Sequence, residues 1–195
     1  MRDITERRRK KIISVLSRRQ KDLTLIIDNI HDPHNVSAIL RSCDAFGVHC
    51  IHLYYTTEEF PQLGKKSSAS AVKWVERKRH TSAEEMIKGL RREGFHIIRT
   101  GFGEKARPLG EWDLTLPTAI ILGNEHRGLS PELCELVEDE LYIPMQGMVE
   151  SLNVSVAAAI ILYESWRQRS ERGMYDRASF GEEELARLIE EWCNK

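Results

Sequence analysis

Apolar runs and helix-periodic segments alternate along most of this chain. Short apolar runs bounded by polar residues are typical of strands, and apolar positions three and four apart are typical of helices. The pattern predicts strands at 23–30, 48–54, 72–75, 95–100, 118–122 and 140–143. It predicts helices at 4–20, 35–46, 83–93, 131–137, 153–169 and 182–192. This alternation favours an α/β fold with a largely parallel sheet flanked by helices.

A polar segment, Asp32-Pro33-His34-Asn35, follows the first apolar run and precedes a helix. Pro33 ends the strand, and Asn35 is expected to cap the helix. The apolar stripe of this helix leaves Arg41 on the opposite side. A lone helical arginine is usually a solvated or salt-bridged side chain, so Arg41 alone does not indicate a site.

Two further segments combine a strand end with glycine and polar side chains. After strand 118–122 the chain reads Gly123-Asn124-Glu125-His126-Arg127-Gly128. After strand 140–143 it reads Pro144-Met145-Gln146-Gly147-Met148-Val149-Glu150-Ser151-Leu152-Asn153, and an apolar helix follows. The free N–H groups at a helix start suit an electron-rich ligand. A simple helix cap by Ser151 or Asn153 explains the same pattern.

Together and in this order, the three segments resemble the motifs of the SpoU-type RNA ribose methyltransferases, which belong to the SPOUT superfamily. Asn35 to Arg41 resembles the first motif and Leu122-Gly123-Asn124-Glu125 the second. Ile143-Pro144-Met145 with Ser151-Leu152-Asn153-Val154-Ser155 resembles the third. The basic start and the segments 166–169 and 175–177 resemble the extensions of those members that methylate guanosine at tRNA position 18. The resemblance covers essentially the whole chain.

The resemblance implies a methyltransferase that uses S-adenosyl-L-methionine and acts on the ribose 2′-hydroxyl of guanosine 18 in the D loop of tRNA. The alternative within the family is another tRNA nucleotide or ribosomal RNA. It also implies a cytoplasmic homodimer, and a sheet that ends in a deep trefoil knot, which the strand pattern alone does not predict. The implied parts are a basic helical extension at 1–21, a methyltransferase domain at 22–170 and a C-terminal helical extension at 171–195.

The implied site residues form three groups. The catalytic group is Arg41, Asn35, Glu125, Ser151 and Asn153. The cofactor-binding group is Thr100, Gly101, Leu122, Gly123, Ile143, Met148 and Leu152, with Gly123 expected where backbone approaches the ligand. The tRNA-binding group is Arg8, Lys11, Arg19, His34, Arg167 and Arg169. No metal is implied, because the sulfonium donor is already activated for displacement.

The resemblance also implies roles for the catalytic group. A guanidinium stays protonated in proteins, so we expect Arg41 to clamp a phosphate beside the target ribose and to orient the hydroxyl. A phosphate oxygen or water would then carry the proton away. Asn35 is expected to hold the first-motif turn and the dimer contact, and Glu125 the pocket edge. Ser151 and Asn153 are expected near the cofactor and the reacting ribose.

The formal net charge of −1 conceals a basic start. Residues 1–21 carry nine Lys and Arg against two acidic residues, whereas residues 182–195 carry five Glu against two basic residues. The local excess of seven positive charges favours contact with a polyanion, because the local patch governs phosphate contact. A solvated amphipathic helix is the simpler alternative.

Two other function classes compete. Gly101-Phe102-Gly103-Glu104-Lys105-Ala106 fits the dinucleotide fingerprint G-x-G-x-x-A. Pro108 and Gly110 interrupt the helix that this fingerprint requires, and the ribose-binding acidic residue is missing from its expected place. A tRNA-binding protein without catalysis is the second class. The intact Arg41, Glu125, Ser151 and Asn153 argue against it, and a methyl-transfer assay with labelled cofactor separates the two.

The cysteines favour a reduced, cytoplasmic protein. The four cysteines show no C-x-x-C spacing, and no secretory signal precedes them. His49 and Cys50 would point to opposite faces of a strand, so no metal site is expected there. The longest apolar run is too short to cross a bilayer, and no membrane partner is expected.

Overall fold

The computed structural model describes residues 4–63, 71–124 and 126–195, and these residues build one seven-stranded sheet. The strands are β1 (Leu23–Asp28), β2 (Cys50–Tyr54), β3 (Glu76–His80), β4 (His96–Thr100), β5 (Arg107–Pro108), β6 (Thr118–Leu122) and β7 (Glu140–Tyr142). Their order across the sheet is β3-β2-β1-β6-β4-β7-β5, and neighbouring strands are parallel. The predicted α/β fold with a parallel sheet is therefore confirmed, whereas the trefoil knot stays a prediction.

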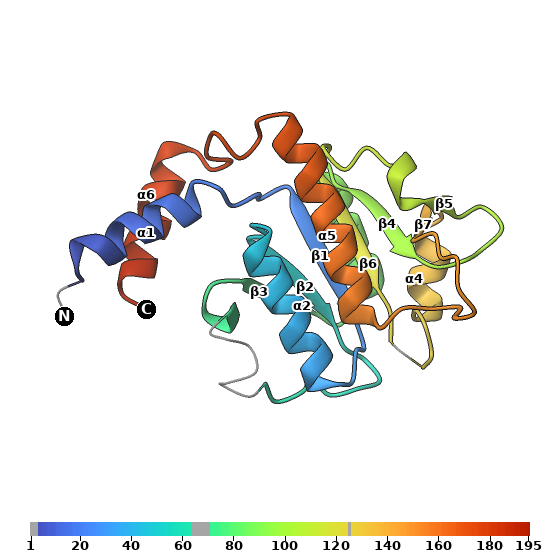
Figure 1. The fold of residues 1–195 in the computed structure, drawn as a ribbon. Helices are drawn as coiled ribbons and strands as arrows, with labels where there is room; N and C mark the ends of the chain where they lie inside the picture. The colour runs from blue at the N-terminus through green and yellow to red at the C-terminus, as the bar shows by residue number, and fades with distance from the viewer. Residues whose placement is uncertain (1–3, 64–70, 125) are drawn as a thin grey trace.

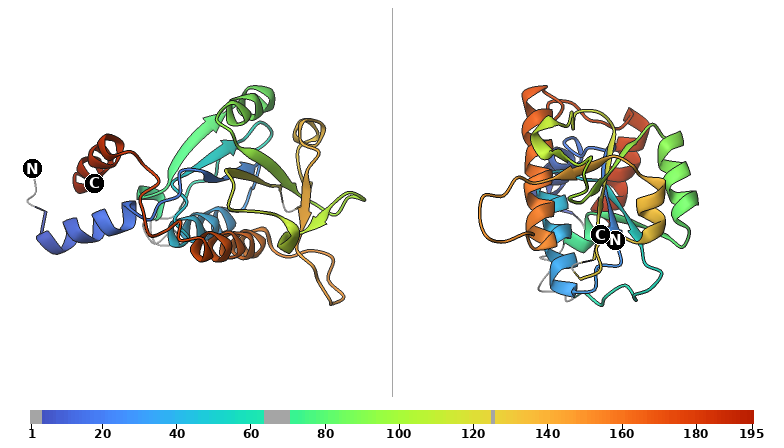
Figure 2. Two further views of the ribbon diagram at one scale, coloured as in Figure 1. Left: turned by 90° about the horizontal axis from the view of Figure 1, so that it is seen from above. Right: turned by 90° about the vertical axis from the view of Figure 1, so that its right-hand side faces the viewer.

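Helices cover both faces of this sheet. They are α1 (Glu6–Leu16), α2 (Pro33–Ala45), α3 (Ala83–Arg92), α4 (Pro131–Leu136), α5 (Val154–Glu171) and α6 (Glu182–Cys193), with 3-10 turns at Ala71–Lys73 and Leu109–Glu111. α2 and α5 lie side by side on one face, and α3 and α4 lie on the other (Figures 1 and 2). Within the described residues, no helix combines the length and apolar character needed to cross a bilayer.

The two central strands are apolar along their length because both of their faces are covered. β1 (LTLIID) and β6 (TAIIL) are buried at every position. One core lies between the sheet and the α2–α5 layer, and a second lies between the sheet and the α3–α4 layer. Strands that are buried on both faces in this way are expected in parallel sheets. The carboxyl ends of these strands present the motif loops.

The predicted strand at 72–75 is wrong. Residues Ala71–Lys73 form a 3-10 turn, and the strand that follows is β3, whose first four residues are exposed. β3 is the sheet's edge and pairs with β2 alone. An edge strand held mainly by backbone hydrogen bonds needs no apolar alternation, and charged residues there discourage pairing with another chain. Its polar sequence therefore gave no strand pattern.

The start of α2 also differs from the expectation. Asp32 is the N-cap, with its Oδ1 accepting a hydrogen bond from the backbone N–H of His34 over 2.8 Å. Pro33 occupies the first helical position, where its missing N–H costs nothing. Asn35 therefore lies inside the first turn rather than at the cap, and its side chain is buried.

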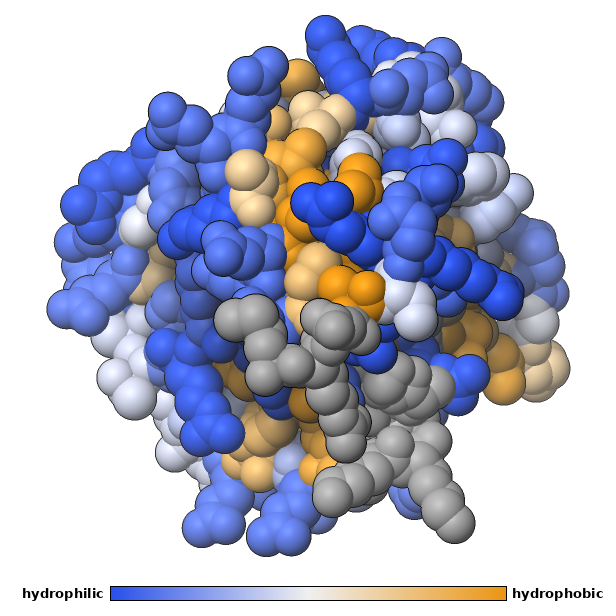
Figure 3. All heavy atoms as spheres, turned by 90° about the vertical axis from the view of Figure 1, so that its left-hand side faces the viewer, coloured by the Kyte–Doolittle hydropathy of each residue, from blue (hydrophilic) through white to orange (hydrophobic). Residues whose placement is uncertain are grey.

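The two terminal helices pack against each other, away from the sheet. α1 and α6 share a small apolar core that includes Ile12, Leu16 and Trp192. The start of α1 and the C-terminal end of the chain lie at this end of the molecule (Figures 1 and 2). Seen from this end, an apolar stripe runs between largely hydrophilic surfaces (Figure 3). The predicted extensions thus contact one another, while the boundaries at 21 and 170 stay predictions.

Candidate active site

A cavity of about 430 Å³ lies where β4, β6 and β7 end. Ligands of open α/β sheets commonly bind beyond the carboxyl ends of the strands. The structure brings together residues from all of these ends and from the start of α5. The sequence-predicted residues that line the cavity are Thr100, Gly101, Leu122, Gly123, Ile143, Ser151, Leu152 and Asn153.

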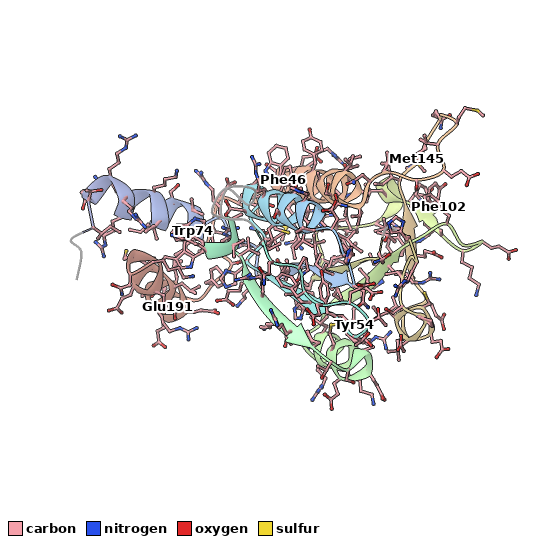
Figure 4. All side chains as sticks on the ribbon, turned by 90° about the horizontal axis from the view of Figure 1, so that it is seen from below. Phe46, Tyr54, Trp74, Phe102, Met145 and Glu191 are labelled. Carbon is pink, nitrogen blue, oxygen red and sulfur yellow. The ribbon has the colours of Figure 1, made fainter. Side chains whose placement is uncertain are left out.

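The structure does not bring Met148 to the cavity. Its side chain is fully exposed, and Met145 lines the cavity instead. Met145 and Phe102 lie at the same end of the molecule, in the loops after β7 and β4 (Figure 4). Met145 therefore joins the candidate cofactor set, and a cofactor contact of Met148 stays a prediction. Phe102 and Tyr142 also line the cavity but were not predicted from the sequence. Phe102 directly follows Gly101 and Tyr142 directly precedes Ile143, so their position next to predicted residues was the available signal.

Gly123 is required by the folding of its own loop. A Cβ atom at this position would lie 2.7 Å from the backbone carbon of Gly128. Asn124 and Gly128 close this loop with two backbone hydrogen bonds, of 2.8 and 3.0 Å. Gly128 has a φ of 71°, a conformation that favours glycine. Close packing of the loop's two sides is thus one reason for glycine at this position, and close approach of a ligand at the cavity stays a prediction.

Asn124 anchors this second-motif loop to β1. Its side-chain Nδ2 donates to the backbone oxygen of Asn29 over 2.6 Å. Its Oδ1 accepts from the backbone N–H groups of His126 and Arg127, over 2.9 and 3.1 Å. A buried amide with these partners fixes the loop firmly, because each bond would be costly to leave unmade. Glu125, the predicted pocket-edge residue, lies outside the described residues.

Asp28 supports the same loop from below. Its carboxylate accepts hydrogen bonds of 2.6 Å from both the backbone N–H and the hydroxyl of Ser130. Asn29 Nδ2 donates to the same carboxylate over 2.9 Å. Burial nevertheless raises the pKa of Asp28 above its usual value, because desolvation outweighs these bonds. Ser130 is the N-cap of α4 as predicted, but its hydroxyl donates to Asp28 and makes no capping hydrogen bond to the helix.

Asn153 joins the first and third motifs. As the N-cap of α5, its Oδ1 accepts from the backbone N–H and the hydroxyl of Ser155, over 2.9 and 2.6 Å. Its Nδ2 donates to Oδ1 of Asn35 on α2 over 3.0 Å. The helix-cap interpretation of Asn153 therefore holds, and the same side chain also binds the neighbouring helix. Ser151 lines the cavity, and its hydroxyl bonds to none of the residues described.

Arg41 lies on α2, beyond Asn35, with its side chain exposed. It does not line the cavity of its own chain. No hydrogen bond or ion pair to the part of the chain described holds its guanidinium, which is therefore available to a ligand. His34, at the start of the same helix, is also exposed.

Four of the six residues in the predicted tRNA-binding group are exposed. These are Arg8 and Lys11 on α1, His34, and Arg167 on α5. Arg167 bonds to Glu164 and Glu171 along its own helix, over 2.8 and 2.7 Å. The exposed Arg167 guanidinium can still contact a phosphate, because ion pairs between exposed side chains are weak in water.

Arg19 and Arg169 are corrections to that group, because neither side chain has exposed surface. The Arg19 guanidinium pairs with Asp44 and donates to the backbone oxygen of Val48 over 2.7 Å. Arg169 pairs with Asp22 over 2.5 Å and donates to the backbone oxygen of Leu114 over 2.9 Å. Arg19 ties the N-terminal segment to α2 and to Val48, shortly before β2, whereas Arg169 ties the end of α5 to the residue before β1 and to Leu114. Neither side chain reaches a phosphate in this structure. Their acidic partners are distant in sequence, which hid this role.

The cavity has the size and walls of a site for a small organic ligand. Its volume falls within the usual range for such pockets, roughly 300–1,000 Å³. Apolar side chains such as Leu141 and Ile161 suit an aromatic base, and the loop backbones offer donors and acceptors. Among the described residues, no cluster of three or more His, Cys, Asp or Glu has a geometry that could hold a metal ion.

Comparison with known proteins agrees with this geometry. The chain is 45% identical over 195 residues, all of both chains, to the tRNA (guanosine(18)-2′-O)-methyltransferase of Thermus thermophilus. It is 40% identical to the Escherichia coli enzyme of the same name, covering 92% of this chain and 79% of that one. A crystal structure of the A. aeolicus TrmH/SpoU tRNA modifying enzyme superposes with a TM-score of 0.90 at 39% identity, covering 97% and 96% of the chains.

A family match and a cofactor complex add to these likenesses. The methyltransferase AviRb of Streptomyces viridochromogenes, crystallised with AdoMet, superposes with a TM-score of 0.69 at 29% identity, covering 78% of this chain and 62% of that one. Residues 22–163 match the SpoU rRNA Methylase family, and this range holds every residue that lines the cavity. The chain is a methyltransferase and belongs to the SpoU methylase family.

Proposed function

We propose that this enzyme transfers a methyl group from S-adenosyl-L-methionine to the ribose 2′-hydroxyl of guanosine 18 in the D loop of tRNA. The observation that carries the proposal is the cavity at the ends of β4, β6 and β7, which the second and third motif segments line. The first motif segment is tied to it through the bond between Asn35 and Asn153. Relatives named for this reaction are 40–45% identical to the chain, and the Thermus relative matches it end to end.

The cavity suits the proposed cofactor. Thr100 and Gly101 form one wall, Leu122 and Gly123 a second, and Leu152 leads into α5. When bound, the cofactor supplies a methyl group on a sulfonium, activated for in-line displacement without a metal. The apolar side chains would hold the adenine ring, and the loop backbones would bind the polar atoms of ribose and methionine. The neighbour AviRb with bound AdoMet supports this choice.

Arg41 is the proposed catalytic cation. Its guanidinium stays charged, so it would bind a phosphate next to the target ribose and hold the 2′-hydroxyl in line with the methyl group. A bidentate contact of this kind is stronger and more directional than a lysine contact. The hydroxyl proton would pass to a phosphate oxygen or to water as the new bond forms.

The remaining catalytic residues have supporting roles in this proposal. Ser151 lines the cavity, and its hydroxyl, which has no hydrogen-bond partner among the described residues, would bind the ribose. The 3.0 Å hydrogen bond between Asn153 and Asn35 fixes the position of α5 relative to α2. Glu125 is proposed to shape the edge of the pocket, by resemblance to the family's second motif.

A homodimer would complete this site. Arg41 lies outside the cavity of its own chain. A second chain would therefore have to bring its Arg41 to the cofactor that is bound in this cavity. α5 exposes apolar Val156, Tyr163 and Trp166, which are 46%, 53% and 37% exposed. An apolar helix face next to α2 is suited to a two-fold interface, since the same patch then meets itself. Two such cavities, each with the partner's arginine, would form the dimer's active sites.

The proposed tRNA surface comprises His34, Arg8, Lys11 and Arg167, with phosphate contacts that position the RNA rather than read its sequence. We place the enzyme in the cytoplasm, where tRNA is modified and where the four free cysteines would stay reduced. The trefoil knot is proposed on the family resemblance.

A methyl-transfer assay tests the proposal. The full-length protein is incubated with labelled S-adenosyl-L-methionine and with unmodified tRNA or ribosomal RNA, and the labelled nucleosides are identified. The expected product is 2′-O-methylguanosine from tRNA. Label in a methylated base would contradict the reaction, and label confined to ribosomal RNA would contradict the substrate while leaving the reaction class intact.

A further inference from the structure

The connection from β4 to β5 passes over β7. β7 lies between these two strands, and all three are parallel. Thr100 at the end of β4 pairs with Leu141, and Arg107 at the start of β5 pairs with the same residue. Residues 101–106 must therefore cross β7 without a helix, in a crossover much shorter than the usual dozen or so residues. So short a crossing brings backbone close to the side chains of β7.

Glu140, the first residue of β7, fills the space under this crossing. A Cβ atom at Gly101 would lie 1.7 Å from Oε1 of Glu140, and one at Gly103 would lie 2.5 Å from Oε2. Neither glycine has a positive φ. The carboxylate itself, and not the backbone conformation, therefore excludes a side chain at both positions.

The Glu140 carboxylate is held in place. Its residue is 5% exposed, and Arg99 Nη1 donates to Oε1 over 2.9 Å. Arg99 is itself fixed, because its Nε donates to the backbone oxygen of Val137 over 2.9 Å. Moving the carboxylate away would break a part-buried ion pair and leave a buried carboxylate without its partner, which is unfavourable. The crossing backbone must therefore follow the surface that Glu140 presents.

We propose that Glu140 is a positioning residue for the cofactor, acting through the segment 101–106. Gly101 and Phe102 line the cavity, whereas Glu140 lies behind them and does not. By fixing how far Gly101 and Phe102 stand from the opposite wall, Glu140 sets the width of the cavity. This inference rests on the proposed cofactor site, and nothing in the motif resemblance assigns a role to Glu140.

Paired substitutions test the contact directly. S-adenosyl-L-methionine is titrated calorimetrically into full-length wild type, Gly101→Ala, Glu140→Ala and the double variant, with cofactor-free thermal unfolding as the check on folding. Overpacking in Gly101→Ala should push the wall inward and raise the Kd about tenfold or more. The double variant should bind the cofactor more tightly than Gly101→Ala and about as well as Glu140→Ala, because Glu140→Ala removes the atoms that the new methyl group meets. Gly110→Ala is the matched control, since its Cβ would enter open space.

The outcomes separate the inference from the proposed function. Wild-type cofactor binding with a double variant no better than Gly101→Ala would overturn the inference alone, as would a Gly101→Ala variant that binds normally. A wild type that does not bind the cofactor would contradict both. If Gly101→Ala does not fold, Glu140→Gln and Glu140→Ala decide. The Gln variant, which keeps the shape and the Arg99 bond, should bind within about twofold of wild type, and the Ala variant several-fold more weakly. Equal affinities would overturn the inference.

Discussion

The side-chain amide of Asn153 donates a 3.0 Å hydrogen bond to the side chain of Asn35, although 118 positions separate the two residues. Asn153 begins α5 and Asn35 lies in the first turn of α2, so the bond joins the two helices that cover one face of the sheet. Arg41 follows Asn35 on α2, while Ser151 precedes Asn153 at the cavity. The bond therefore fixes α2, which carries Arg41, relative to the cavity of the same chain, and in the proposed dimer this sets where each Arg41 meets the partner's cavity.

Substitution of Asn153 separates its two roles. Asn153→Ala should lower the free energy of unfolding by about 1–2 kcal/mol, because it loses both the helix cap and the bond to Asn35. Asn153→Ser keeps a good cap but cannot reach Asn35, so it should lose less stability and still lose activity. Denaturant unfolding and methyl transfer, measured on both variants, check this. Full activity of Asn153→Ser would mean that the bond to Asn35 is dispensable.

Arg41→Lys should lose at least about tenfold in kcat, since the charge remains but the planar fork does not. Cofactor affinity and the unfolding transition should not change, because Arg41 is exposed and outside its own chain's cavity. Steady-state kinetics with tRNA, beside a cofactor titration, measure both. Arg92→Lys on the opposite face of the sheet is the matched control. Normal turnover of Arg41→Lys would reject the phosphate clamp.

The basic face of α1 is expected to bind tRNA phosphates. Neutralising Arg8 and Lys11 to Gln should weaken tRNA binding and reduce the log–log salt slope by roughly 0.7–0.9 for each phosphate that the variant no longer neutralises. Cofactor affinity should stay the same, because α1 lies away from the cavity. Lys88→Gln with Arg92→Gln, exposed on α3, is the control pair. An unchanged slope in the Arg8 and Lys11 variant would identify α1 as a solvated face.

Stability should depend on the neutral state of His52. Its Nδ1 lies 2.8 Å from Nε2 of His80, and burial, with a smaller effect of His80, lowers the pKa of His52 from 6.5 to about 4. Below pH 6.5 the His52 side chain takes up a proton in the unfolded chain, whereas in the folded protein it stays neutral down to about pH 4. The free energy of unfolding should therefore fall between pH 6.5 and about 4, by up to about 3 kcal/mol.

Urea unfolding across this pH range, at fixed protein concentration, measures the effect. His52→Gln should flatten the pH dependence, whereas His31→Gln, in which an exposed ring is replaced, should leave it as in the wild type. Equal slopes for wild type and His52→Gln would show that other groups cause the fall in stability.

The sequence predicts the buried elements of the fold well and the exposed or short ones poorly. β1 and β6 have continuous apolar runs because both of their faces are buried. β3 is an exposed edge with the sequence ERKRH, and the two-residue β5 is too short to leave a pattern. Periodicity reports burial, so elements held by backbone pairing alone escape it.

The site shows a similar limit. Motif order places Thr100, Gly101 and Leu152 around one cavity, as the resemblance implies. Charge alone does not separate Arg8, which is exposed, from Arg19, which is buried against Asp44. The difference depends on partners brought together by folding, and so does the packing of Glu140 against Gly101. Contacts between residues that are far apart in the sequence cannot be predicted from the local pattern of apolar and polar residues.

The most direct test of the proposed function is methyl transfer to tRNA that lacks a single hydroxyl. Two full-length tRNA transcripts are compared, one with 2′-deoxyguanosine at position 18 and one with the same replacement at the neighbouring guanosine. The proposed function predicts that the first transcript accepts no label and that the second is labelled like unmodified tRNA, with the label mapping to guanosine 18. Equal labelling of both transcripts would contradict it.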